Sequence, residues 1–170
     1  MSKEIHTIPD DFTPHKRIQK IYNDRLESIN IGKNIDWATA EALAFATLLK
    51  DGFGVRLSGQ DVGRGTFSHR HAVLYDQVNE KRFVPLRHFR EEQALFEIVD
   101  SFLSEFGVLG FEYGYSQADP KTLVIWEAQF GDFSNGAQTI IDQFITTGER
   151  KWLRMSGLTL LLPHGHEGQG

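Results

Sequence analysis

The 170-residue sequence contains no cysteine, which excludes disulfide bridges, thiolate metal ligands and a cysteine nucleophile. It has no apolar run long enough to span a bilayer. Its first residues also lack the apolar core of a secretory signal. Acidic side chains outnumber basic ones, 23 to 18, and the formal net charge of −5 argues against a basic surface for nucleic acid.

The remaining composition is that of a single folded domain. The sequence is 40% hydrophobic and 24% charged, which is enough to form a buried core. Most of its sixteen glycines gather at 52–65, 107–114, 131–136 and 165–170. The chain ends on a glycine in HGHEGQG, directly after an apolar run, so we expect a piece of a longer protein, truncated at its C-terminus.

Apolar residues at three- and four-residue spacing predict five helices. They cover about 14–29, 36–51, 91–101, 105–117 and 132–145, the last opening at Asp132 or Ser134. Arg and Lys dominate the outer face of the first helix. Asp36 and Ser104 are suitable N-caps for the second and fourth. In the second helix we expect a buried stripe that consists of Trp37, Ala40, Leu43, Ala44 and Leu48.

Short apolar runs predict strands within 54–61, 122–126 and 158–162, and the stretch 64–90 is expected to be loop with short strands. Strands that alternate with helices indicate an α/β fold: three layers, with a mostly parallel sheet and helices on both faces. An N-terminal helix precedes this sheet. We therefore expect a lead-in and surface helix over 1–33 and the main domain over 34–170.

Ligands of such sheets gather at the carboxyl ends of the strands. Three predicted strands end there in polar or glycine-rich sequence: LSGQD, IWEAQFGDF and LLPHGHEGQG. The candidate site residues in this text are Gln60, Asp61, Phe130, Phe133 and His164. Phenylalanine is usually a core residue, but Phe130 and Phe133 flank Gly131 and could also form a stacking platform for a flat ring.

The helix over 105–117 allows two interpretations. Gly107, Gly110 and Gly114 share one face, which suits either tight packing within the domain or a helix–helix contact across a dimer interface. Spacing alone favours neither interpretation of the glycine positions. Glu105, in the first turn, is by spacing alone an acidic residue favoured by the helix dipole, and Glu112 has no better claim to a catalytic role.

The histidines do not predict a metal site. His69 and His71 alternate, but no acidic third partner stands at ligand spacing, so a hydrogen-bonding loop is favoured over zinc. His164, His166 and Glu167 match no helical zinc motif. A plain surface turn and a backbone that turns closely around a ligand both remain open for that segment.

Long, ordered matches identify a resemblance over residues 34–170. The strings RLSGQDVGRGTFSHRHAVL, LSEFGVLGFEYGYS, WEAQFGDFSNGAQTIIDQFI and LLPHGHEGQG resemble successive motifs of the decarboxylase components of 2-oxoglutarate dehydrogenase complexes. In that family the region is the pyrimidine-binding domain, shared in fold with transketolase. The family enzymes are oxidoreductases of the tricarboxylic acid cycle that depend on thiamine diphosphate (thiamine pyrophosphate).

The resemblance implies decarboxylation of 2-oxoglutarate and transfer of succinyl to a lipoyl group of the dihydrolipoyl succinyltransferase component. It also implies a homodimer, formed through the glycine-striped helix 105–117, in the bacterial cytoplasm or mitochondrial matrix. No nucleic-acid or membrane partner is expected. The same chemistry on 2-oxoadipate is an alternative, and a non-catalytic dimerisation or binding module is another.

The resemblance also assigns roles. LSEFGVLGFEYG aligns without gaps onto the segment whose glutamate bonds to the cofactor's pyrimidine, so Glu105, not Glu112, is the implied catalytic residue. Phe130, ahead of Phe133, would lie under the pyrimidine, Gln60 and Asp61 near the cofactor, and His164 near the substrate. His166 replaces a usual tyrosine. The motif for Mg²⁺ and the diphosphate belongs to an upstream domain, so this chain alone should neither bind the cofactor tightly nor turn over substrate.

Overall fold

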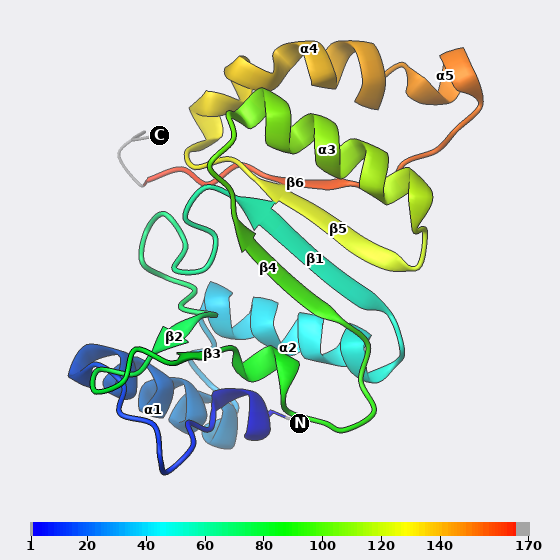
Figure 1. Ribbon diagram of the computed structural model, residues 1–170. Helices are drawn as coiled ribbons and strands as arrows, with labels where there is room; N and C mark the ends of the chain where they lie inside the picture. The colour runs from blue at the N-terminus through cyan, green and yellow to red at the C-terminus, as the bar shows by residue number, and fades with distance from the viewer. Residues whose placement is uncertain (1, 166–170) are drawn as a thin grey trace.

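A computed structural model describes residues 2–165 of the chain, and its centre is a parallel sheet (Figure 1). Four strands lie in the order β4 (Phe96–Asp100), β1 (Gly54–Gly59), β5 (Thr122–Glu127) and β6 (Thr159–Leu161). Leu57 in the middle of β1 pairs with Ile98 on one side and Ile125 on the other. The predicted α/β architecture is confirmed.

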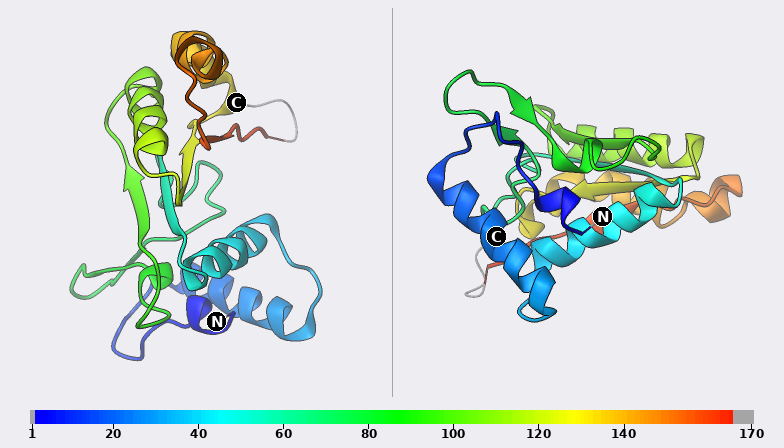
Figure 2. Two further views of the ribbon diagram at one scale, coloured as in Figure 1. Left: turned by 90° about the vertical axis from the view of Figure 1, so that its right-hand side faces the viewer. Right: turned by 90° about the horizontal axis from the view of Figure 1, so that it is seen from below.

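Helices cover both faces of this sheet (Figures 1 and 2). One face packs against α2 (Trp37–Lys50), with α1 (Lys16–Ile31) farther out. The other carries α3 (Glu105–Ala118), α4 (Gln138–Ile140), the π-turn η4 (Ile141–Ile145) and α5 (Gly148–Trp152). Within residues 2–165, no helix is both long and apolar enough to cross a membrane.

Short elements complete the fold. Single-turn 3₁₀ segments are η1 (Glu4–His6) and η2 (Pro85–Arg87), and a longer one is η3 (Gly131–Ala137). The stretch 64–90 is loop around a two-stranded antiparallel ladder of β2 (Leu74–Tyr75) and β3 (Arg82–Phe83), as predicted. The final predicted helix is instead divided among η3, α4 and η4, because its first turns contain Gly136, which disfavours the α-helix.

The core has two parts, one on each side of the sheet. Between α2 and the sheet lie Phe45, Leu49, Leu57, Phe96 and Ile98. Between the sheet and the α3–α4 layer lie Val108, Leu109, Trp126, Ala137 and Ile140. Burying one such large side chain contributes about 1.5–3 kcal/mol, so both layers are fixed to the sheet by apolar contact.

Two predicted helix starts are confirmed. Asp36 Oδ1 accepts a hydrogen bond from the Thr39 backbone N–H at 2.7 Å. Ser104 Oγ accepts one from the Gly107 N–H at 3.4 Å. Each satisfies a backbone donor that the helix cannot pair, which fixes where α2 and α3 begin.

Two other predictions are wrong. Residues 96–100 form β4 and not part of a helix, because Phe96 and Ile98 alternate with more exposed residues and pair with β1. In α2 the buried apolar residues are Ala38, Phe45, Ala46 and Leu49. Of the predicted stripe, Leu43 and Leu48 pack against the core partly buried, whereas Trp37 is 76% exposed. This helix is apolar on most sides, so spacing alone could not identify the inward face.

Candidate active site

The candidate site lies at the carboxyl edge of the sheet, where β1, β4 and β5 end (Figure 1). Three segments meet there: the loop after β1, the turn after β5 that runs into η3, and the start of α3. A parallel sheet brings these segments together although they are far apart in the sequence. The site therefore depends on the fold and not on one local motif.

Glu105 is the buried carboxyl of this site and is only 8% exposed. Its Oε1 accepts a hydrogen bond from the Gln129 backbone N–H at 3.0 Å. Its Oε2 is buried and has no hydrogen-bond partner among residues 2–165. Burial raises the pKa of Glu105, and the Gln129 N–H and the Trp126 indole partly offset this rise.

The unpaired Oε2 is chemically informative because a buried polar atom without a partner is costly. The Trp126 indole N–H lies near enough to lower the pKa of Glu105, but it is buried and makes no hydrogen bond of good geometry within the described part of the chain. The carboxyl oxygen can accept a hydrogen bond when ionised or donate one when protonated. It is therefore suited to a ligand that presents a ring nitrogen.

Gln129 connects Glu105 to the loop after β1. Its side-chain amide donates to Asp61 Oδ2 at 2.8 Å, while its backbone N–H bonds to Glu105. Asp61 has a left-handed backbone, with φ of 57°, and also lies 3.2 Å from an Arg64 guanidinium nitrogen. The sequence analysis missed Gln129, although it is the first polar side chain after β5, at the strand end where ligands are expected.

Gln60 links two of the segments that form the site. Its amide donates to the Leu103 carbonyl at 3.1 Å, which ties the loop after β1 to the segment just before α3. A contact between Gln60 and the cofactor stays a prediction, and so does one from Asp61.

Aromatic side chains form one connected group beside Glu105. The rings of Phe130 and Phe133 meet edge to face, with centroids 5.7 Å apart. Phe67, which the sequence analysis did not select, meets Phe130 in the same way at 5.7 Å. Phe67 and Phe133 are 42% and 47% exposed, so this group keeps ring surface open to a ligand.

His164 reaches the same region from the end of β6. Its Nδ1 lies 2.8 Å from the Leu162 carbonyl, and its Nε2 lies 3.3 Å from Asp132 Oδ1. The ring packs directly against Gly131, where a Cβ atom would collide with it. His166 and Glu167 lie outside the described residues.

The other polar candidates have structural partners. Glu112 is fully buried and makes a bidentate ion pair with Arg56, with hydrogen bonds of 2.8 and 2.9 Å. The His69 ring packs against Gly65, and burial lowers its pKa. Among residues 2–165, no group of three or more histidine or carboxylate side chains could hold a metal ion.

Comparisons with known proteins agree with this geometry. Residues 33–170 match the transketolase pyrimidine-binding domain. The chain is 58% identical over all of its 170 residues to the 2-oxoglutarate dehydrogenase E1 components of Brucella ovis, Brucella abortus and Brucella anthropi. It spans 17% of the length of each of these relatives. With its parallel sheet and the match over most of its length, the chain belongs to the transketolase pyrimidine-binding domain family.

Proposed function

We propose that this chain forms the pyrimidine-binding half of a thiamine diphosphate site in a 2-oxoglutarate dehydrogenase decarboxylase. The observation that carries the proposal is the buried Glu105 carboxyl, which has one oxygen fixed by Gln129 and the other unpaired among residues 2–165. The relatives named as 2-oxoglutarate dehydrogenase E1 components support the same reaction.

Glu105 would share a proton with a nitrogen of the cofactor's pyrimidine ring. Because burial raises its pKa, the carboxyl is closer to exchanging a proton near neutral pH than an exposed glutamate. The Gln129 N–H fixes Oε1, so Oε2 is the oxygen left for the ligand. The bound cofactor supplies the electron sink for decarboxylation, and the protein supplies orientation.

The neighbouring residues would orient the ring and the substrate. Phe130, with Phe133 and Phe67 against it, provides the aromatic surface for the pyrimidine. Asp61 and Gln60 hold the adjacent loop and lie within the region that the cofactor would approach. His164, placed against Gly131, would face the substrate.

We also propose that Mg²⁺ and the diphosphate are held mainly by a domain outside this chain. Calorimetry of the chain with thiamine diphosphate and Mg²⁺ should therefore show no micromolar binding. Micromolar binding would contradict this division of the site.

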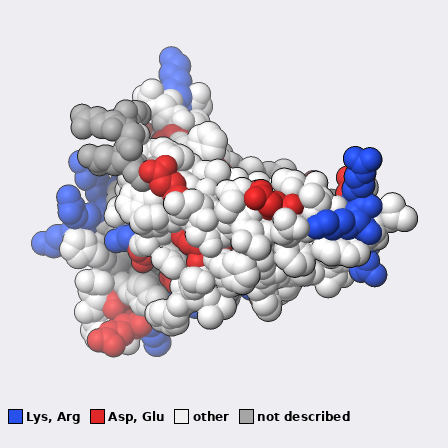
Figure 3. All heavy atoms as spheres, turned by 90° about the horizontal axis from the view of Figure 1, so that it is seen from above, with Lys and Arg blue, Asp and Glu red and all other residues white. Residues whose placement is uncertain are grey.

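A second copy of the chain is the expected partner of α3. Three aromatic side chains on or beside this helix are open to solvent: Phe102 is fully exposed, and Phe106 and Phe111 are 49% and 58% exposed. In Figure 3, which looks onto the helices on this side of the sheet, uncharged surface surrounds a few groups of Asp and Glu, and Lys and Arg lie mainly toward the ends. Such an apolar face is typical of a protein interface, so we propose a homodimer through α3. The dihydrolipoyl succinyltransferase component is the proposed acceptor partner, and the bacterial relatives favour the cytoplasm.

The decisive experiment is Glu105→Gln in the complete enzyme that contains this chain. The variant should lose most decarboxylation of 2-oxoglutarate while keeping its fold, because glutamine cannot exchange the proton. Glu149→Gln, at an exposed position in α5, is the matched control and should retain activity. Near-normal turnover by Glu105→Gln would overturn the assignment. Assay of 2-oxoadipate beside 2-oxoglutarate decides between the two substrates.

A further inference from the structure

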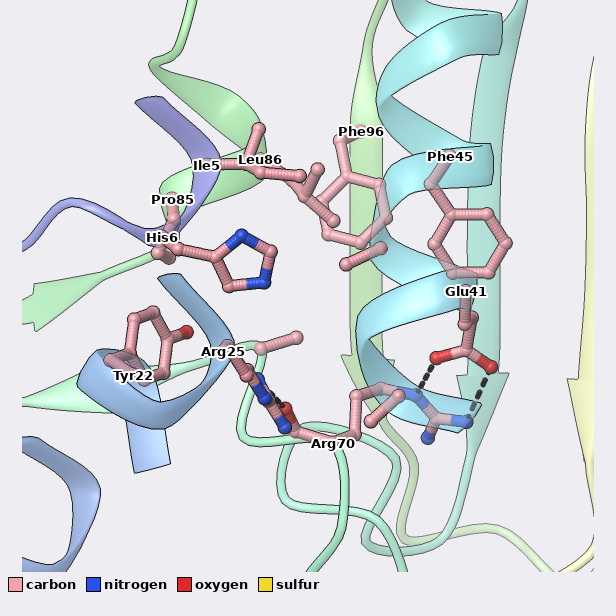
Figure 4. A pocket seen from close by; sticks show the side chains of 13 residues that line it. Ile5, His6, Tyr22, Arg25, Glu41, Phe45, Arg70, Pro85, Leu86 and Phe96 are labelled. Atoms are coloured by element: carbon pink, nitrogen blue, oxygen red, sulfur yellow. Dashed lines mark hydrogen bonds and ion pairs between the residues drawn. The ribbon is translucent and has the colours of Figure 1, made fainter. Parts of the chain in front are cut away.

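Arg70 lies at the centre of a buried ion cluster, and its side chain is 4% exposed (Figure 4). It donates to the two carboxylate oxygens of Glu41 at 2.6 and 3.1 Å. It also donates to those of Glu127 at 2.9 and 2.5 Å. A further bond of 3.0 Å reaches the Val62 carbonyl. One guanidinium group therefore satisfies two buried carboxylates and a loop carbonyl at once.

These contacts join three parts of the fold. Glu41 lies on α2, Glu127 is the last residue of β5, and Val62 lies in the loop that follows β1. Arg25 of α1 supports the same loop from outside, donating to the Arg70 and His69 carbonyls at 3.0 and 2.6 Å. The loop is thus held near its start, at Val62, and near its end, at His69 and Arg70.

The cluster lies next to the candidate site. Glu127 precedes Gln129 by two residues, and the loop held by Arg70 also contains Asp61, which bonds the Gln129 side chain. The loop leaves β1 at Gly59, which pairs with Glu127 so closely that a Cβ atom there would collide with the Glu127 carbonyl oxygen. Any displacement of the loop from the end of β5 would therefore separate Asp61 from Gln129, whose N–H holds Glu105.

We propose that Arg70 is a positioning residue for Glu105: by pairing with Glu127 and Glu41 it holds the loop 60–71 against the end of β5. It makes no hydrogen bond or ion pair with Glu105 and acts through Asp61 and Gln129. Its relevance to catalysis rests on the function proposed above, but the positioning itself is a property of the cofactor-free chain.

A second buried arginine provides the control. Arg56 of β1 makes a bidentate pair with Glu112 on the α3 side of the sheet, and it makes no hydrogen bond or ion pair with the loop 60–71. Lysine cannot reproduce a bidentate guanidinium contact at either position. Arg70→Lys and Arg56→Lys should therefore both weaken a buried ion pair, but only Arg70→Lys should release the loop.

Amide hydrogen exchange of the cofactor-free chain tests this difference. The reporters are the loop amides that donate within the chain: Gly65 to Asp61, Arg70 and His71 to Arg64, and Ala72 to Gly63. The Gln129 amide, bonded to Glu105, reports on the site itself. Arg70→Lys should speed exchange at these amides at least about tenfold more than Arg56→Lys does, with the Thr146 and Lys151 amides, which neither arginine contacts, changing equally in both variants.

Glu41→Gln is a milder test if Arg70→Lys does not fold. It keeps an acceptor for Arg70 but removes one charge, so the same amides should exchange faster, by a smaller factor. Unchanged loop and Gln129 amides in the folded variants would overturn the proposal, and so would a uniform increase over the whole chain. Because no cofactor is present, a failed thiamine diphosphate assignment would leave this result unaltered.

Discussion

The Gln129 backbone N–H donates a 3.0 Å hydrogen bond to Glu105 Oε1, which joins the end of β5 to the first turn of α3. This contact explains why a carboxyl group can be buried at the edge of the sheet without a basic partner. The other carboxylate oxygen, Glu105 Oε2, has no hydrogen-bond partner among the described residues. A buried, unpaired carboxylate oxygen that would hold a ligand should lower the free energy of unfolding, and this effect can be measured without any ligand.

Glu105→Gln should stabilise the chain at neutral pH, by on the order of 1 kcal/mol. The folded-state pKa of Glu105 is raised above its ordinary value of 4.5, so the folded chain binds this proton more tightly than the unfolded chain. The stabilisation that comes from protonating Glu105 is complete below its ordinary pKa of 4.5. It is lost as the pH rises through the higher folded-state pKa. Urea unfolding should show a larger gain for Glu105→Gln at pH 8 than at pH 5. An equal gain at both values would contradict the burial of an ionised carboxyl.

Gly131→Ala should displace His164, because the added Cβ would occupy the place of the imidazole ring. Because the His164 ring is the far end of a half-exposed side chain that can move away, the free energy of unfolding should change by no more than about 0.5 kcal/mol. Imidazole NMR signals should report the break of the contact between His164 Nε2 and Asp132. Gly136→Ala is the control, since within the described chain nothing lies near its Cβ position. Unchanged His164 signals in Gly131→Ala would show that the ring does not occupy this position in solution.

Gly114 separates the two interpretations of the glycine stripe. Gly110 packs against Ile140 inside the domain, whereas no atom of residues 2–165 beyond its own helix and chain neighbours lies within 4 Å of a Cβ at Gly114. Gly114→Ala should therefore stabilise the monomer by about 1 kcal/mol through helix propensity. Gly114→Leu should also fold but should weaken self-association, measured by sedimentation, if α3 is the dimer interface. Undiminished association of Gly114→Leu would place the interface elsewhere.

The sequence predicted the sheet because 122–126 and 158–162 are short, wholly apolar runs, and it predicted two helix starts because Asp36 and Ser104 are local capping signals. It failed where local patterns were ambiguous. Residues 96–100 are too few to separate helical from alternating spacing until β1 provides a pairing partner. For α2, the choice of buried face depends on contacts from distant segments.

The site residues also divide into those that the local sequence indicated and those that depend on distant contacts. The resemblance pointed to Glu105 and the aromatic residues after β5, but not to what surrounds them. Gln129 and Arg70 act through contacts with residues 24 and 57 positions away, Glu105 and Glu127. Such contacts depend on how the strands are ordered in the sheet. Spacing along the chain does not contain that order.

The two glutamates of α3 should respond oppositely to substitution. Glu112→Ala leaves the guanidinium of Arg56 without its bidentate partner, so it should destabilise the chain, by about 3 kcal/mol. Glu97, at 3.2 Å, and the rings of Phe111 and Tyr115 still contact Arg56 and limit the loss. Glu112→Leu combined with Arg56→Met should recover most of the stability, because the two buried charges are removed together. Denaturant unfolding of the single and double variants measures this coupling. Additive losses would mean that the pair does not stabilise α3 on β1, and that the contrast between a structural Glu112 and a functional Glu105 is unfounded.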